Sequence, residues 1–147
     1  MKISNGLKII IKNYQKKIPV NPKRIKKAIL NVLSCERVNK PGEISVCFVD
    51  DTEIIRLNKR YCKKCSATDV LSFDITDPLD KKHLFADIAI SSDTAWRNSG
   101  IFKTTPGYEL RLYVIHGILH LVGYDDQSPT QRKLMRRKEK KYVDRKN

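Results

Sequence analysis

The chain has 147 residues, of which 40% are hydrophobic and 31% are charged, and it carries a formal net charge of +14. That length suits one domain able to bury its own core. No stretch approaches the ~20 consecutive apolar residues of a transmembrane helix, and residues 1–17 lack the apolar core and cleavage site of a signal peptide. We therefore expect one globular domain over residues 1–147, located in the cytoplasm and without a membrane partner.

The first half of the chain predicts two strand–helix pairs. Residues 7–14 are typical of a strand, and Asn21-Pro22 then supplies a helix N-cap followed by proline at the first helical position. The basic helix that follows has one apolar face, made by Ile25, Ala28, Ile29, Val32 and Leu33. Residues 43–49 are the second predicted strand, and Asp50 or Asp51 caps a helix that runs to about residue 61.

The second half predicts two strands followed by three helices. Residues 69–73 and 83–91 are the strands, and residues 92–101 form a helix that we expect Trp96 to anchor. The next helix begins after Thr105 and is apolar on nearly every side up to Val122, which is typical of a buried helix. A capping-box pattern at residues 128–131 opens a last, strongly basic helix that runs to about residue 144.

The predicted order βαβαββααα indicates one α+β domain, α/β-like in character, with a mixed β-sheet of about four strands packed with helices. Neither an internal repeat nor a long linker interrupts it.

A metal site is predicted at the end of the buried helix. His116 and His120 are four residues apart, so both imidazoles project from one helix face and can share a zinc ion. Gly123 ends the helix, and a turn there can bring Asp125 or Asp126 back over that face as a third ligand. Both acids are candidates for that position. The alternative is two helical histidines with separate structural roles.

Three protein ligands leave a fourth position for water, which marks a catalytic rather than a structural zinc site. Zinc-bound water is expected to be the nucleophile, and the sequence assigns no protein side chain as its base. The zinc peptidase motif His-Glu-x-x-His places a glutamate after its first histidine. Here that residue is Gly117, which argues against peptide hydrolysis.

The four cysteines are interpreted as reduced thiols, because nothing in the sequence indicates secretion. Cys62 and Cys65 have the spacing of a metal or redox pair, but a zinc ribbon needs a second such pair and none exists in the sequence. We interpret the pair as incidental.

The positive charge is concentrated at both ends of the chain. Residues 1–40 carry eleven Lys and Arg against one acid, and residues 128–147 carry nine against two. Such basic flanks favour a polyanionic partner, for which nucleic acid and a membrane surface are the two candidates. The predicted phosphate contacts on the two basic helices are Arg24, Lys27, Arg132 and Arg136. The alternative is a solvated surface that serves solubility only.

The stretch from His116 to Asp125 resembles the signature His-Gly-x-Leu-His-Leu-x-Gly-Tyr-Asp-His of bacterial rRNA maturation factors, the YbeY-type endoribonucleases. Further blocks that resemble this family occur in the expected order along nearly the whole chain. They are Leu57-Asn58-x-x-Tyr61, residues 68–73, Asp87-Ile88-x-Ile90-Ser91, Glu109, Met135 and Glu139.

This resemblance implies a zinc-dependent, single-strand-specific endoribonuclease that acts in 16S rRNA 3′-end maturation and late ribosome quality control. It implies rRNA and the small ribosomal subunit as partners, with no DNA or membrane partner expected. It also implies a mixed sheet covered by helices with the metal site on the central helix. Two hypotheses remain beside it: a non-catalytic RNA-binding assembly factor that retains a metal site, and a metallohydrolase of another substrate class.

Two positions depart from the family pattern. The family's third metal ligand is a histidine, where this chain has Asp126, so the resemblance implies Asp126 as the third ligand, with Asp125 in reserve. A carboxylate is a competent zinc ligand but also suits harder divalent metals. The family usually has an arginine after the tyrosine of its Asn-x-x-Tyr-Arg block, where this chain has Cys62. Arg60, Lys63 and Lys64 are the expected replacements for that positive charge.

Overall fold

The computed structural model describes residues 6–62, without the side chain of Cys62, and residues 68–144. The predicted contacts Lys63 and Lys64, and the Cys62–Cys65 pair, lie outside what it describes. The strands are β1 (Leu7–Asn13), β2 (Gly42–Val49), β3 (Val70–Asp74) and β4 (Leu84–Ser91). The helices are α1 (Pro22–Cys35), α2 (Asp51–Cys62), α3 (Ser92–Phe102), α4 (Pro106–Leu121) and α5 (Pro129–Val143). This order confirms the prediction.

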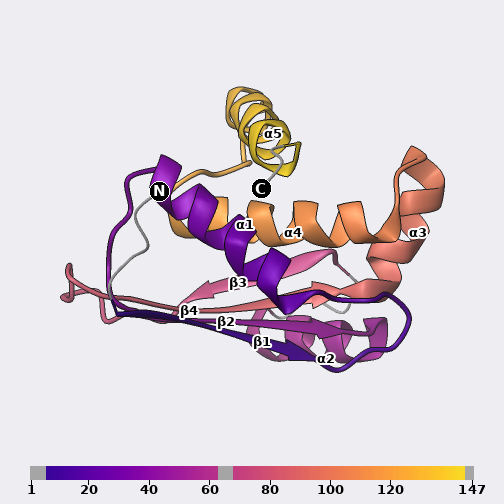
Figure 1. The fold of residues 1–147 in the computed structure, drawn as a ribbon, viewed down its shortest axis with the longest axis horizontal. Coiled ribbons are helices and arrows are strands. Elements are labelled where there is room, and N and C mark those ends of the chain that lie inside the picture. The colour runs from indigo at the N-terminus through magenta and orange to yellow at the C-terminus, as the bar shows by residue number, and fades with distance from the viewer. Residues whose placement is uncertain (1–5, 63–67, 145–147) are drawn as a thin grey trace.

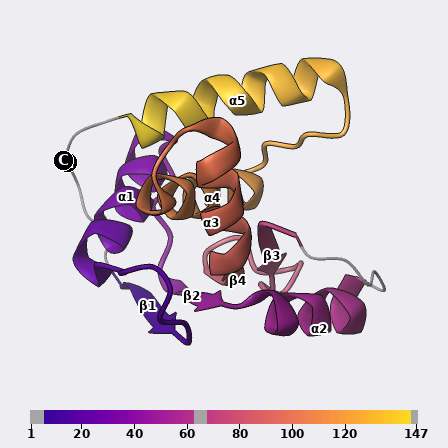
Figure 2. The same ribbon diagram turned by 90° about the vertical axis from the view of Figure 1, so that its right-hand side faces the viewer.

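The four strands form one mixed sheet in the order β1-β2-β4-β3. β1 pairs with β2 and β2 with β4 in parallel, whereas β3 runs antiparallel to β4. Parallel neighbours need a crossover connection, and α1 supplies it between β1 and β2. The helices α1 and α4 lie on one face of the sheet, α2 lies on the other, and α5 packs over α4 on the side away from the sheet (Figures 1 and 2). The α+β class predicted from the sequence is therefore confirmed.

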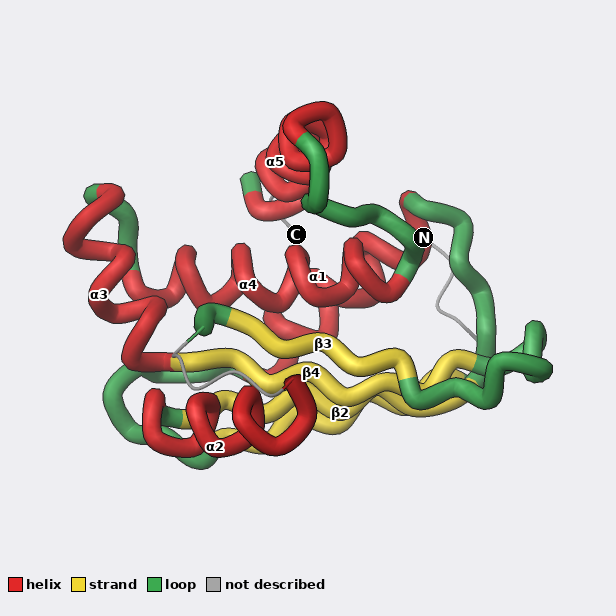
Figure 3. Tube along the Cα trace, turned by 180° about the vertical axis from the view of Figure 1, so that it is seen from behind, coloured by secondary structure: helices red, strands yellow, loops and turns green. Residues whose placement is uncertain are grey.

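Alternation along the strands assigns the two sheet faces. Ile44, Val46 and Phe48 of β2 are fully buried and belong to the core cluster under α1 and α4. The alternate residues face α2, where a smaller cluster contains Val49, Ile54, Leu71 and Ala89. Figure 3 shows α2 on this second face, viewed from behind. Because successive side chains of a strand point to opposite faces of the sheet, alternate residues pack against the helices on the two faces.

The helix α1 begins where its sequence predicts. The side chain of Asn21 accepts hydrogen bonds from the backbone N–H groups of Lys23 and Arg24, and Pro22 occupies the first turn. Its predicted apolar face is buried. Its basic residues remain exposed on the opposite side.

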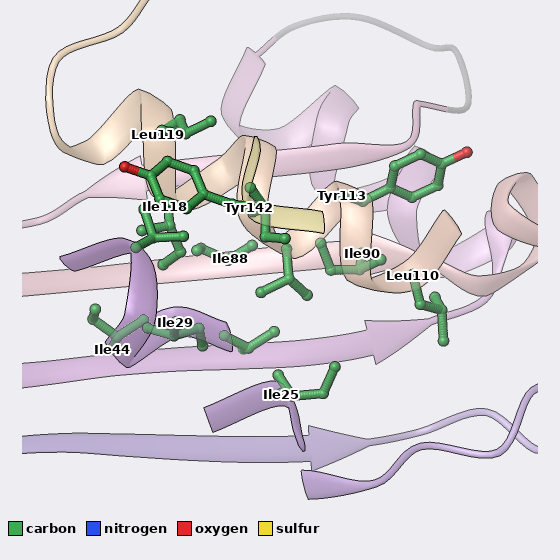
Figure 4. Packing of buried hydrophobic residues seen from close by; sticks show 14 of the residues in the cluster. Ile25, Ile29, Ile44, Ile88, Ile90, Leu110, Tyr113, Ile118, Leu119 and Tyr142 are labelled. Atoms are coloured by element: carbon green, nitrogen blue, oxygen red, sulfur yellow. The ribbon is translucent and has the colours of Figure 1, made fainter. Parts of the chain in front are cut away.

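The helix α4 is the central element of the fold. Val114, Ile118 and Leu119 are completely buried, and α4 contacts β3, β4, α1, α3 and α5. Figure 4 shows Ile118 and Leu110 of this helix among the isoleucines of α1, β2 and β4. A helix enclosed in this way has one solvent-facing edge, and that edge carries His116 and His120.

One expectation about α3 is wrong. Trp96 was expected to anchor this helix, but its side chain is 51% exposed, and the buried residues are Ala95, Ser92 and Ser99. The small residues allow α3 to approach its neighbours closely, so the tryptophan faces outward. None of the helices in the described parts of the chain has the length and apolar character needed to cross a bilayer.

Candidate metal centre

His116 and His120 lie one turn apart on the exposed edge of α4. Their Nε2 atoms are 3.0 Å from each other, and the rings meet edge to face. The side chains are 20% and 30% exposed, so solvent reaches both. The packing of α4 on the sheet fixes the helix, and the helix repeat alone brings the two nitrogens together.

The turn after α4 brings an acid to the same place. Gly123 has φ of +110°, a conformation that favours glycine, and the N–H of Tyr124 bonds back to the carbonyl of Leu119 at 3.0 Å. The reversed chain places Asp126 Oδ2 3.6 Å from His116 Nε2 and 3.5 Å from His120 Nε2.

Asp125, the reserve ligand, does not join the group. One of its carboxylate oxygens accepts the N–H of Asp126 at 2.8 Å, and the residue is exposed. Its role in the structure is to cap its own turn. The potential ligand atoms of His116, His120 and Asp126 all lie within 4.8 Å of one another, and they form the only such group of His, Cys, Asp and Glu in the described residues.

The donor set and its spacing fit a divalent metal ion. Bonds of ~2.0–2.2 Å at tetrahedral angles put neighbouring ligand atoms about 3.4 Å apart. The three separations here, 3.0, 3.5 and 3.6 Å, lie around that value. Two imidazoles and one carboxylate can therefore occupy three corners of a tetrahedron with little rearrangement, leaving the fourth toward solvent.

Glu139 of α5 supports this group from behind. His116 Nδ1 donates a hydrogen bond to Glu139 Oε2 at 2.5 Å, which leaves the Nε2 lone pair free for a metal. Burial alone lowers the pKa of His116, but the hydrogen bond and charge of Glu139 outweigh it, with further contributions from Asp69 and Asp126, so that the pKa is raised. The same carboxylate fixes both the ring orientation and the tautomer.

Gly117 explains why no peptidase-type base stands between the histidines. Its Cα is packed on the sheet, and a Cβ there would lie 3.3 Å from side-chain methyl groups of both Ile88 and Val70. The Ser72 hydroxyl also donates to the Gly117 carbonyl at 3.1 Å. A glutamate at this position would have to enter the core rather than the metal centre.

Comparison with known proteins assigns the chain to one family. The family profile described as Endoribonuclease YbeY matches residues 10–147. The chain belongs to the YbeY endoribonuclease family.

Relatives within the family are similar over most of the chain. A YbeY endoribonuclease of Pelotomaculum thermopropionicum is 35% identical over 147 residues, covering 95% of this chain and 97% of the relative. One from Anaeromyxobacter sp. strain Fw109-5 is 43% identical over 98 residues, covering 67% of this chain and 51% of that protein. The solution structure of a Thermotoga maritima protein superposes with a TM-score of 0.64 at 29% identity, covering 92% of this chain and 86% of the other.

In this YbeY-family chain, three of the predicted RNA contacts are free to meet a polyanion. Arg24 and Lys27 are exposed on α1, and Arg136 is exposed on α5. Arg60 is exposed near the end of α2, where its guanidinium lies 5.3 Å from the centre of the Tyr61 ring. Because α2 covers the sheet face opposite α4, Arg60 stands on another layer from the histidines. These contacts stay predictions.

Arg132 has a different environment from the one expected. Its Nη1 atom donates to the backbone carbonyls of Asp126 at 3.4 Å and Gln127 at 3.2 Å. Arg132 thus braces the turn that carries the third potential ligand, although its side chain is exposed.

The sequence interpretation assigned no role to Glu139. A signal for it exists, because Glu139 is the only acid in the otherwise basic segment 129–143. A single carboxylate within such a basic segment is expected to bind a specific side chain elsewhere in the fold. Its partner lies 23 residues earlier in the chain, so no local pattern reveals the pair.

Proposed function

We propose that this protein is a metal-dependent endoribonuclease that cleaves single-stranded RNA at the centre formed by His116, His120 and Asp126. The convergence of these three side chains on one point, within a YbeY-family fold, is the observation that supports it. Zinc is the proposed ion, one per chain. The carboxylate of Asp126 also allows harder divalent metals.

Each residue of the centre has a distinct role in this proposal. His116 and His120 present nitrogen ligands from a rigid helix, and Asp126 supplies a negatively charged oxygen from the turn. Glu139 holds the His116 ring in the tautomer that leaves Nε2 free. A divalent ion bound here supplies Lewis acidity toward a phosphodiester and lowers the pKa of water. No protein side chain is assigned as the base.

Basic residues outside the centre are proposed to hold the RNA backbone. The net charge of +14 favours association of the protein surface with a polyanion. Arg24, Lys27 and Arg136 offer exposed cations from two helices on the α4 side of the sheet. Arg60, Lys63 and Lys64 remain the proposed replacements for the family arginine. Arg132, which is exposed on α5, remains a proposed phosphate contact beside Arg136.

The family resemblance supports a cellular role in 16S rRNA 3′-end maturation and late-stage ribosome quality control, with the small subunit as partner, in the cytoplasm. A second candidate function is a non-catalytic RNA-binding assembly factor that retains the metal site. It is favoured by the two departures at Asp126 and Cys62, which change a ligand and remove a phosphate contact.

Elemental analysis of untreated protein, followed by an RNA cleavage assay, tests the proposal. We expect about one equivalent of metal per chain, and cleavage of a single-stranded fragment from the 3′ region of precursor 16S rRNA that stops on chelation and returns on adding Zn²⁺. A duplex of the same sequence and a DNA strand are the substrate controls, and His116→Ala is the enzyme control. Metal without cleavage under any of these conditions supports the assembly factor instead.

A further inference from the structure

A second carboxylate in the basic part of the chain forms a hydrogen-bonded cluster behind the metal centre. Glu36, at the C-terminal cap of α1, is the only acid in residues 1–40. Its Oε1 atom accepts a hydrogen bond from the Tyr124 hydroxyl at 2.6 Å. Its Oε2 atom accepts from Lys138 Nζ at 3.1 Å and from the Tyr142 hydroxyl.

These three donors come from the two segments that carry the carboxylates of the metal centre. Tyr124 lies two residues before Asp126, in the turn after α4. Lys138 is the neighbour of Glu139 on α5. Glu36 therefore connects α1 to both segments, over sequence separations of 88 and 102 residues.

The cluster is rigid on its α1 side and partly shielded from water. The α1 helix is anchored by Ile29 and Val32, both completely buried, and the Glu36 side chain is only 11% exposed. Lys138 Nζ also lies 5.3 Å from the centre of the Tyr124 ring. Hydrogen bonds to a charged acceptor with low solvent exposure are stronger than neutral ones.

The turn bearing Asp126 has few other attachments. Its backbone is held at one end by the helix-terminating bond from Tyr124 N–H to Leu119, and further on by two side chains of α5, Gln131 and Arg132. The Tyr124 ring also packs against the edge of the core. Among the described residues, the hydrogen bond from the Tyr124 hydroxyl to Glu36 is the side-chain hydrogen bond that joins this turn to α1. Without it, Asp126 has to be ordered when a metal binds, and that entropy lowers the affinity.

We propose that Glu36 is a positioning residue for the metal centre: through Tyr124 it orders the Asp126 turn, and through Lys138 it fixes the part of α5 that presents Glu139. This inference rests on the metal site of the proposed function. The hydrogen-bond partners of Glu36 are Tyr124, Lys138 and Tyr142, none of which is a proposed metal ligand. Glu36 therefore acts through these residues on metal affinity and coordination geometry.

Two conservative variants test the proposal. Tyr124→Phe removes only the hydroxyl, and Glu36→Gln removes the charge while keeping the shape. Tyr113→Phe is the matched control, because it removes a buried tyrosine hydroxyl that also bonds a carboxylate, Glu109 at 3.3 Å, on the same helix as the histidines but away from the Asp126 turn. Zn²⁺ affinity is measured by competition with a chromogenic chelator, and the unfolding temperature is measured on metal-free protein.

Loss of a group hydrogen-bonded directly to a metal ligand weakens metal binding about 10- to 100-fold. Because Glu36 and Tyr124 act one contact further from the ligands, we expect Tyr124→Phe and Glu36→Gln to weaken Zn²⁺ binding by the lower figure, about 10-fold. Tyr113→Phe should lower the unfolding temperature without this loss of affinity. The absorption spectrum of the Co²⁺-loaded protein should change in the two cluster variants, since it reports coordination geometry, and should not change in the control.

Two results would overturn the role of Glu36 and leave the proposed metal site standing. If both cluster variants bind Zn²⁺ as tightly as the parent while unfolding at lower temperature, Glu36 only stabilises the fold. If Tyr113→Phe weakens Zn²⁺ binding equally, the effect is general destabilisation. Failure of the parent protein to bind Zn²⁺ or Co²⁺ overturns the proposed metal site as well, which distinguishes the two failures.

Discussion

His116 and Glu139 are joined by a hydrogen bond of 2.5 Å that links the central helix α4 to the last helix α5. The bond runs from Nδ1, the imidazole nitrogen that faces away from His120 and Asp126. The carboxylate therefore acts on the ligand group from the protein side. Burial lowers the pKa of His116, but the hydrogen bond to this carboxylate, followed by its charge, outweighs burial and raises the pKa.

Glu139→Gln should weaken Zn²⁺ binding by about 10-fold, because it removes the charge that orients His116 and strengthens its Nε2 as a donor. In the metal-free protein, the pKa of His116, measured by NMR, should fall. Glu53→Gln is the control. Glu53 accepts a hydrogen bond from the exposed Arg56 on α2, and neither residue takes part in the proposed metal centre. Unchanged affinity with Glu139→Gln would show that the hydrogen bond does not support a ligand.

His116→Ala should abolish most metal binding while leaving the domain folded. The His116 side chain lies at the exposed edge of α4 and contributes little to the core, which is built from other faces of that helix. Metal content and far-UV circular dichroism check both parts. Unfolding by this substitution, or by a chelator, would falsify a catalytic site and indicate a structural metal.

Asp126→His should restore the three-histidine pattern of the family signature and bind Zn²⁺ at least as tightly as the parent. The imidazole replaces a carboxylate that lies 3.5 Å from His120 Nε2, so the new ring has to reach the same point from the same turn. Asp125→His serves as the control, because Asp125 caps its own turn instead. Complete loss of metal from Asp126→His alone would mean that the turn accommodates only a short side chain.

Acid should destabilise the protein partly through Glu36. Burial raises the pKa of this carboxyl, but the hydrogen bonds from Tyr124, Tyr142 and Lys138 outweigh burial and hold it below the ordinary value of 4.5. A group with a lowered folded-state pKa stabilises the fold above its unfolded value, and this contribution is lost as the pH falls through the lowered one.

The difference in unfolding free energy between the parent and Glu36→Gln should therefore be largest above pH 5 and shrink as the pH falls below 4.5. Urea unfolding at a series of pH values measures it. A difference that stays constant with pH would mean that the ionised carboxylate has no special stability in the cluster.

The exposed cations of α5 should contribute to RNA affinity through phosphate contacts. Each phosphate neutralised on a single strand adds ~0.7 to the slope of log affinity against log salt. Replacing Lys133, Arg136 and Arg137 by Ala should therefore reduce that slope by up to about 2, with little dependence on RNA sequence. Arg132 is left in place because it braces the Asp126 turn.

The matching experiment on α1 replaces Arg24, Lys26 and Lys27. The control replaces the exposed Lys81, Lys82 and Lys103, which removes the same charge from other elements. Binding of a single-stranded rRNA fragment across a salt series is the measurement. Equal effects of all three sets would indicate a general charge effect, and no effect of the α1 and α5 sets would remove both helices from RNA binding.

Much of this protein was predictable because the relevant interactions lie within one turn of backbone. Asn21 caps the N–H groups of residues two and three positions further on, Gly123 ends the helix before it, and two histidines four residues apart share a helix face in any helix. The element order and the histidine pair therefore follow from local geometry, without knowledge of the packing.

The remaining features depend on segments that meet only when the domain is packed. Asp125 and Asp126 are adjacent residues of the same type. The direction of the turn after Gly123 places the carboxylate of Asp126, and not that of Asp125, beside the histidines. Trp96 is exposed because smaller residues of α3 fill the contact. Glu139 and Glu36 reach partners 23 to 106 residues away, where nothing but the stacking of α1, α4 and α5 sets the distances. Sequence patterns predict contacts between residues one helical turn apart, because the backbone fixes their distance. They do not predict contacts between residues this far apart in the chain, because only the tertiary packing decides which of these side chains meet.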